Sequence, residues 1–165
     1  MAATTSSGSA VVALPGETQI HVTRDFNAPK DLVYRALTEP ELIRRWWNAK
    51  RGEVTECTVD LRVGGGWRYV MLTDDGIEVA FHGAYREIVP NERLVYTEVF
   101  EMPGVSDDDA TVNTVTLEDT DGRTTMTSIT ECHTTEVRDM IMATGMEAGM
   151  QDAYDLLEEV AISLR

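Results

Sequence analysis

Residues 145–164 repeat apolar side chains with the period of an α-helix. At about 100° per residue, apolar side chains share one face and mostly acidic side chains share the other. A helix with so polar a back cannot be buried all round, so its apolar stripe requires a partner surface. The stripe comprises Met146, Met150, Ala153, Tyr154, Leu157, Val160, Ala161 and Leu164, and the polar face comprises Glu147, Gln151, Asp155, Glu158 and Glu159.

Three further residues define the environment of this helix. Ile162 falls on the acidic face, where an exposed isoleucine offers a contact for a homodimer. Gly145 and Gly149 lie along one edge of the apolar face, and a missing side chain lets a neighbouring segment approach closely there. Gly145 also separates the long helix from a shorter one expected at residues 136–143.

Upstream of this helix, apolar and polar positions alternate with the period of two that is typical of strands. Turn-forming stretches such as Asp119-Thr-Asp-Gly122 separate the segments, and such short connections predict an antiparallel meander. One strand, two short helices, six strands and a long helix indicate an α+β fold with the helix on one sheet face. The expected strands are residues 20–26, 53–61, 67–72, 77–88, 93–100, 110–117 and 123–132, and the short helices are residues 29–37 and 41–47.

Alternation within the strands predicts an aromatic sheet face beneath the methionine-rich helix. Methionine fills irregular gaps, including gaps left for a ligand. Ligand pockets have mostly apolar walls with a few hydroxyl or amide groups, so these facing surfaces form either a large aromatic core or a cavity. The candidate ligand-binding residues are Trp67, Tyr69, Met71, Phe81, Tyr85, Tyr96, Phe100, Met146, Met150 and Tyr154.

Length and charge narrow the classes of protein and partner. A length of 165 residues predicts one domain, which we place at residues 17–165 and expect to bind a ligand. Residues 1–16 have low sequence complexity and are expected to form a flexible tail. The net charge is −15, and residues 98–165 hold 16 acidic and 3 basic side chains. Such a surface repels phosphate backbones, which argues against a nucleic-acid partner.

Localisation and cofactors follow from what the sequence lacks. No apolar run approaches the length of a membrane helix, and the N-terminus has neither a basic nor an apolar region typical of a secretion signal. Two cysteines, Cys57 and Cys132, form no disulfide framework and no zinc motif, and they are interpreted as small buried residues. We therefore expect a cytoplasmic protein with no membrane partner, no metal and no cofactor.

No strong catalytic motif is present, since nucleophile elbow, zinc-protease and phosphate-loop patterns are all missing. The catalytic set is therefore expected to be empty. His82, Tyr85, Tyr96 and His133 serve as acid or base candidates only where they point inward. The adjacent Trp46 and Trp47 cannot face the same way on a helix, so we expect one in the core and the other at a pocket mouth or a loop.

Several stretches in the same order resemble the SRPBCC (START-like) proteins, and more narrowly those similar to the C-terminal domain of the activator of the heat-shock protein 90 ATPase. The resemblance covers roughly residues 18–164. It implies a helix-grip fold, in which a curved antiparallel sheet of six to seven strands wraps around the C-terminal helix with a cavity between them. The stretches are Phe26-Asn-Ala-Pro29, Val33-Tyr-Arg-Ala-Leu-Thr-Glu-Pro-Glu-Leu-Ile-Arg-Arg-Trp-Trp47, Val63-Gly-Gly-Gly-Trp-Arg-Tyr69, Phe81-His-Gly-Ala-Tyr-Arg-Glu-Ile-Val-Pro-Asn-Glu-Arg-Leu-Val-Tyr-Thr-Glu98 and Ala143-Thr-Gly-Met-Glu-Ala-Gly149.

Three functions remain open at this point. The leading hypothesis is a non-catalytic binder of a small hydrophobic or aromatic ligand, because the facing surfaces are aromatic and no catalytic set is evident. An enzyme similar to the cyclases or hydrolases is the alternative, since such enzymes can fold a substrate in a shaped pocket. The third hypothesis is a stress or co-chaperone interaction module, whose candidate surface is the basic group Arg44, Arg45, Lys50 and Arg51.

Overall fold

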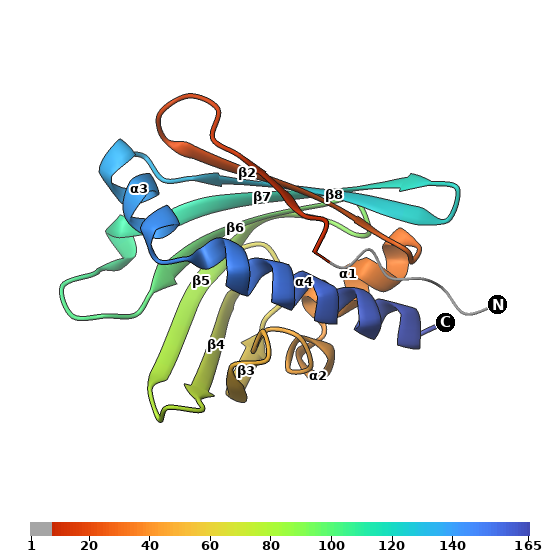
Figure 1. The fold of residues 1–165 in the computed structure, drawn as a ribbon, viewed down its shortest axis with the longest axis horizontal. Coiled ribbons are helices and arrows are strands. Elements are labelled where there is room, and N and C mark those ends of the chain that lie inside the picture. Colours follow the sequence, from red (N-terminus) through yellow and green to blue (C-terminus); the bar gives the residue numbers. More distant parts are fainter. Residues whose placement is uncertain (1–7) are drawn as a thin grey trace.

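Eight strands form one antiparallel sheet that curves around the C-terminal helix α4 (Figure 1). This computed structural model describes residues 8–165 and confirms the α+β, helix-grip fold class. The seven strands and four helices expected from the pattern are all present. The elements are β1 (Val11–Ala13), β2 (Gln19–Phe26), α1 (Lys30–Thr38), α2 (Pro40–Ile43), β3 (Gly52–Val59), β4 (Gly66–Thr73), β5 (Glu78–Val89), β6 (Arg93–Phe100), the 3₁₀ turn η1 (Asp107–Asp109), β7 (Thr111–Thr120), β8 (Arg123–Glu131), α3 (Thr135–Ala143) and α4 (Met146–Ser163).

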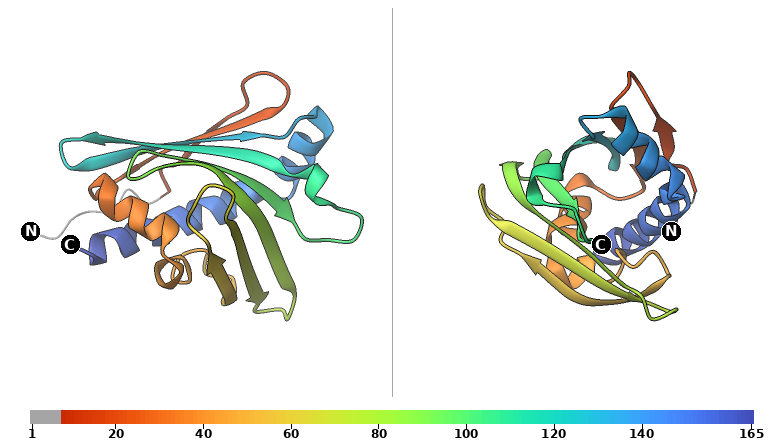
Figure 2. Two further views of the ribbon diagram at one scale, coloured as in Figure 1. Left: turned by 180° about the vertical axis from the view of Figure 1, so that it is seen from behind. Right: turned by 90° about the vertical axis from the view of Figure 1, so that its left-hand side faces the viewer.

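The sheet is a meander extended at one edge by the first two strands. Its order is β1-β2-β8-β7-β6-β5-β4-β3, so β2 pairs with the last strand. The tight β7–β8 turn uses Asp121 and Gly122, which both have positive φ, as a two-residue hairpin turn requires. Register shifts between Val54 and Glu56 and between Tyr85 and Glu87 mark bulges, which bend strands and increase their twist. The curvature around α4 is plain when the molecule is viewed along its long axis (Figure 2).

The N-terminal stretch differs from the flexible tail expected at residues 1–16. Residues 11–13 form the edge strand β1, in which Val12 pairs with Val22. The backbone of Ala10 exchanges two hydrogen bonds with the Gln151 side chain of α4, at 3.1 and 2.7 Å. Val11 and Val12 are β-branched, and such side chains favour strands even within a stretch of low complexity. Residues 1–7 of the expected tail lie outside the described part of the chain.

Helix α4 packs its apolar stripe mainly against α1 and the concave sheet face. Leu157, Val160 and Ala161 are buried in the main core. Gly145 has a φ of 77°, and this left-handed conformation separates α3 from α4 as expected. The polar face of α4 does not meet solvent everywhere, because Glu158 is fully buried. The expected exposure of Ile162 is also wrong, since Ile162 is half-buried and packs against the core.

A second, smaller core lies under the N-terminal half of α4. It joins β1, β2, α3 and α4 and includes buried Ile20 and Val22 together with half-buried Met150. The close approach expected at Gly145 and Gly149 does not occur, because a Cβ built at either position would meet no atom of a neighbouring segment within 4 Å. The long helix therefore spans two cores, and its methionine end belongs to the smaller one.

Candidate functional site

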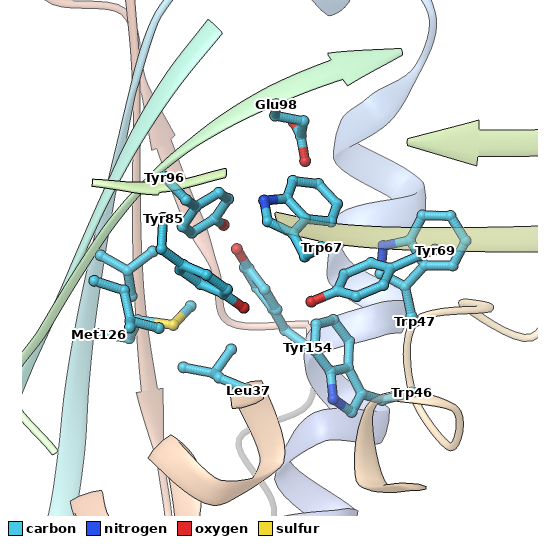
Figure 3. A pocket seen from close by; sticks show the side chains of 12 residues that line it. Leu37, Trp46, Trp47, Trp67, Tyr69, Tyr85, Tyr96, Glu98, Met126 and Tyr154 are labelled. Carbon is cyan, nitrogen blue, oxygen red and sulfur yellow. The ribbon is translucent and has the colours of Figure 1, made fainter. Parts of the chain in front are cut away.

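A cavity of about 170 Å³ lies between the concave sheet face, α4 and the segment that follows α2 (Figure 3). Its wall is mostly aromatic, and β4, β5 and β6 supply one side while Tyr154 of α4 closes another. Because inward positions recur every second residue along a strand, neighbouring strands present matching aromatic rows. The lining residues are Leu37, Trp46, Trp47, Trp67, Tyr69, Tyr85, Leu94, Tyr96, Glu98, Val115, Met126 and Tyr154.

Both adjacent tryptophans reach this cavity. The helix expected at residues 41–47 is shorter, since α2 ends at Ile43 and turns follow. Trp46 is buried and donates from Nε1 to the Ala36 carbonyl at 2.7 Å. Trp47 is half-buried and meets the Tyr69 ring edge-on, with centroids 5.5 Å apart. We expected one tryptophan in the core and the other at a pocket mouth or a loop. Trp46 is indeed the more buried of the two, but both residues line the same cavity.

The indole of Trp67 has room because the residue opposite it on the neighbouring strand is a glycine. Trp67 and Gly83 are paired across β4 and β5, and the indole Nε1 donates to the Thr97 carbonyl at 3.2 Å. A Cβ at Gly83 would lie 1.8 Å from that carbonyl oxygen and 2.8 Å from Nε1. Real Cβ atoms do not come this close to other atoms, so glycine is required at this position.

Four tyrosines carry the hydroxyl groups of the cavity, and in Figure 3 these hydroxyls point toward one another across it. Burial is the main cause that raises the pKa of Tyr85 and of Tyr154 to about 12. The pKa values of Tyr69 and Tyr96 lie well above the usual range, also mainly through burial. All four phenols are therefore neutral donors and acceptors near pH 7.

Glu98 is the single acidic side chain in the lining. Burial raises the pKa of its carboxyl to about 7, and the nearby Asn113 amide offsets part of that rise. Asn113 itself is buried, and its Nδ2 has no hydrogen-bond partner of ordinary geometry among residues 8–165. Glu98 is half-buried, and it is one of the residues that line the cavity. The site thus combines neutral phenols with a carboxyl that titrates near neutrality.

The structure brings five of the ten candidate ligand-binding residues together at this cavity: Trp67, Tyr69, Tyr85, Tyr96 and Tyr154. Their role in binding stays a prediction.

The other five candidates do not line the cavity. Phe81 packs on Trp47 behind the wall, with centroids 5.7 Å apart, and Phe100 stacks on Phe81 near the surface. Met150 lies in the smaller core. Met71 and Met146 are half-buried and do not belong to the lining.

Glu98 is the most informative residue that sequence reasoning missed. The sequence could have identified it, because Glu98 is two residues from both Tyr96 and Phe100 on β6 and therefore lies on the same face of the strand. Leu94 was missed although it lies on the same strand and has the same parity as Tyr96. The other five missed residues come from a helix, a loop or the strands β7 and β8, where the pattern does not show which residues reach the cavity. They are Leu37, Trp46, Trp47, Val115 and Met126.

Of the acid–base candidates, only Tyr85 and Tyr96 face the cavity. His82 lies on the other sheet face, where Nδ1 is 2.9 Å from Glu101 Oε2 and Nε2 is 2.6 Å from Asp107 Oδ1. His133 is exposed in the loop before α3. Cys57 is buried, and burial raises the pKa of its thiol to about 11, so it is not a ready nucleophile. Within residues 8–165, no group of three His, Cys, Asp or Glu side chains could hold a metal ion.

The basic side chains near the tryptophans are largely engaged within the protein. Arg44 donates to the Val54 carbonyl, and Arg45 donates to the Ser163 hydroxyl. Arg51 pairs with Asp152 of α4 at 2.8 Å. A chaperone contact through this surface stays a prediction, as does a homodimer.

Comparison with known proteins assigns this sequence and its fold to a family. A family profile described as "Activator of Hsp90 ATPase homolog 1-like protein" matches residues 27–161. Among curated proteins, none matches the sequence. A protein from Nitrosomonas europaea is 27% identical, with a TM-score of 0.78 over 89% of this chain and 96% of its own. One from Rhodobacter sphaeroides is 26% identical, with a TM-score of 0.84 over 94% of this chain and 99% of its own.

A more distant structure extends the comparison of folds. DynU16, a protein in the dynemicin biosynthetic locus, is 20% identical, and the match has a TM-score of 0.60 over 85% of this chain and 47% of that one. At that identity the likeness concerns the fold alone. No helix among the described residues is long and apolar enough to cross a bilayer. Because the profile covers most of the sequence, the chain belongs to the family of Activator of Hsp90 ATPase homolog 1-like proteins, within the SRPBCC superfamily.

Proposed function

We propose that this protein binds a compact hydrophobic or aromatic ligand, about the size of one ring, in the cavity beneath α4. The observation that carries the proposal is a lining with seven aromatic side chains around about 170 Å³. An engineered protein cavity of about 150 Å³ binds benzene, whereas pockets for drug-sized ligands start at about 300 Å³. The ligand is therefore smaller than a fatty acid or a sterol.

The tryptophans provide a direct measurement of binding. All three tryptophans of the chain line the cavity, so intrinsic fluorescence reports on this site. Toluene, anisole and cyclohexanol, which absorb little at 295 nm, should shift or quench the emission in a saturable way, whereas palmitate should not. A panel of such ligands without any saturable change would overturn the proposal.

A pair of variants on one strand localises the effect. Val115 of β7 lines the cavity, and Val112 is half-buried on the other face of the same strand. Val115→Phe should fill the cavity and weaken binding at least 10-fold. Val112→Phe adds the same volume elsewhere and should leave binding within about 2-fold.

Glu98 favours a second candidate, an enzyme that moves a proton on a bound substrate. A carboxyl with a pKa of about 7 is well matched to general acid–base work near neutrality. The test is deuterium exchange at the α-carbon of cyclohexanone, a ketone of suitable size, followed by NMR. Exchange that saturates with ketone and disappears in Glu98→Gln would support this candidate, and a rate equal to buffer alone would remove it.

A further inference from the structure

The cavity has an unusual charge balance for an apolar site. Glu98 is its single ionisable carboxyl, and no Lys, Arg or His side chain is among the lining residues. Among residues 8–165, no Lys, Arg or His side chain forms a salt bridge with the Glu98 carboxylate. Burying a carboxylate without a counter-charge is costly, so the site lacks the partner that would stabilise its charged form.

We propose that the ligand of this cavity is a small organic cation, an alkylammonium or quaternary ammonium compound, held by the aromatic walls and by the Glu98 carboxylate. This inference rests on the proposed function, because it names the chemical class of ligand for the same cavity.

The arrangement of the rings suits a cation. Trp67 lies 4.7 Å from Tyr69 and 5.7 Å from Tyr96, centroid to centroid, and Tyr85 lies 6.2 Å from Tyr96. An ammonium group that lies over the face of an aromatic ring, within about 6 Å of its centroid, is attracted by the ring quadrupole. Because the rings surround a small volume, one bound cation would lie near several of them at once. This arrangement resembles the aromatic cages that recognise methylated ammonium groups.

Glu98 selects for charge as well as shape. Glu98 lines the cavity together with Tyr96 of β6 and Tyr154 of α4, and after burial its charge is the next cause that raises the pKa values of both phenols. A bound ammonium would gain Coulomb attraction in a poorly solvated site, where it is stronger than in water. A carboxylate or phosphate ligand would instead meet a like charge, so fatty acids and nucleotides are disfavoured. The net charge of −15 adds long-range attraction for cations.

Glu98 is the lining residue whose charge changes between pH 5 and 9. Tyr69 of β4, Tyr85 of β5, Tyr96 of β6 and Tyr154 of α4 face the cavity, and burial raises all of their pKa values. Asn113 of β7, beside Glu98, does not ionise. Affinity for a cation should therefore rise as Glu98 loses its proton, whereas affinity for a neutral ligand of the same shape should not.

The matched probes are choline and 3,3-dimethyl-1-butanol, in which carbon replaces the charged nitrogen. Binding is measured by tryptophan fluorescence and calorimetry on the full chain at pH 8 and pH 5.5. At pH 8 we expect choline to bind at least 10-fold more tightly than the alcohol, with a smaller preference at pH 5.5. Glu98→Gln should remove the preference for choline over the alcohol. Glu118→Gln, which removes one charge from the exposed end of β7, should keep it.

The outcomes separate the two proposals. Equal affinity for both probes, or tighter binding of the alcohol, overturns the cation proposal and leaves ligand binding intact. If neither probe binds but the aromatic panel does, the cation proposal also fails alone. If nothing binds, the proposed function fails with it. A choline preference that persists in Glu98→Gln would also overturn the role of the carboxylate.

Discussion

Arg24 of β2 and Asp155 of α4 form an ion pair in which the guanidinium is completely buried, with Nη2 2.8 Å from Oδ1. Glu158, fully buried one turn further along α4, lies 3.4 Å from the same nitrogen and accepts the Asn27 backbone N–H at 2.7 Å. The guanidinium also lies over the Phe26 ring, 4.9 Å from its centroid. These contacts attach the long helix to the second strand of the sheet.

Arg24→Met should destabilise the protein strongly. Methionine replaces much of the arginine stem, but Asp155 and Glu158 lose their shared cation, and breaking a buried pair costs about 3–5 kcal/mol. Urea denaturation measures the free energy of unfolding. The control is Arg35→Met, which breaks a solvent-exposed pair with Glu39 and should cost far less, because exposed pairs contribute little to stability. Similar losses for both variants would show that the buried cluster contributes no more than a surface pair.

Gly83→Ala should disturb the cavity wall through Trp67. The added Cβ would meet the Thr97 carbonyl and the indole, so the strand or the ring must shift. We expect a loss of about 1–3 kcal/mol, typical of overpacking, and a changed tryptophan emission without any ligand. Gly66→Ala is the matched control, because its Cβ would lie 3.6 Å from the nearest atom, an ordinary contact. An unchanged emission in Gly83→Ala would contradict this role for Gly83.

The order and type of the elements could be predicted because two simple periods describe most of the chain. Strand β6 was predicted at its observed bounds, and the left-handed Gly145 separates the last two helices as expected. Half of the candidate site residues also reach the cavity, since strand parity alone decides which face Tyr69, Tyr85 and Tyr96 share. Local periodicity thus predicted the rows of the sheet that form the site.

The remainder depends on contacts between distant segments, which a periodic pattern does not encode. Glu158 has the position of a solvent-facing residue on the helical wheel, yet Arg24 from 134 positions earlier in the chain accompanies it into the core. Met150 lies on the apolar stripe but packs against Ile20 and Val22, because β1 and α3 cover that end of the helix. Glu98 follows strand parity, but a charged residue in an aromatic row was not expected to point inward.

His82 should hold the η1 turn before β7 through its contact with Asp107, and this contact should depend on pH. Asp107 is the larger cause that raises the pKa of His82 from 6.5, and Glu101 also raises it. This link should be complete below about pH 6.5 and lost as the pH rises through the raised pKa. Hydrogen exchange at the η1 amides, corrected for the intrinsic rate, should therefore be faster at pH 9 than at pH 6.

Two variants test the His82 link. His82→Gln keeps a hydrogen-bonding side chain but has no group that ionises between pH 6 and 9. The difference in η1 exchange between the two pH values should therefore disappear. His21→Gln is the control, because His21 bonds to Gln19 on β2, far in sequence from this segment. Protection of η1 that is equal at both pH values in the unaltered protein would show that His82 does not hold it.

Glu98→Gln should stabilise the protein, and more so at pH 8 than at pH 5. In the folded protein the pKa of Glu98 is about 7, above the ordinary value of 4.5, so folding favours the protonated carboxyl. The resulting stability is complete below about pH 4.5 and is lost as the pH rises to about 7, by on the order of 3 kcal/mol at most. Glutamine is neutral throughout and avoids this loss. Thermal unfolding without ligand, with Glu118→Gln as the control, should show a gain that grows with pH only for Glu98→Gln. A gain independent of pH would mean that the Glu98 carboxyl is well solvated, which would also weaken the case for a cation beside it.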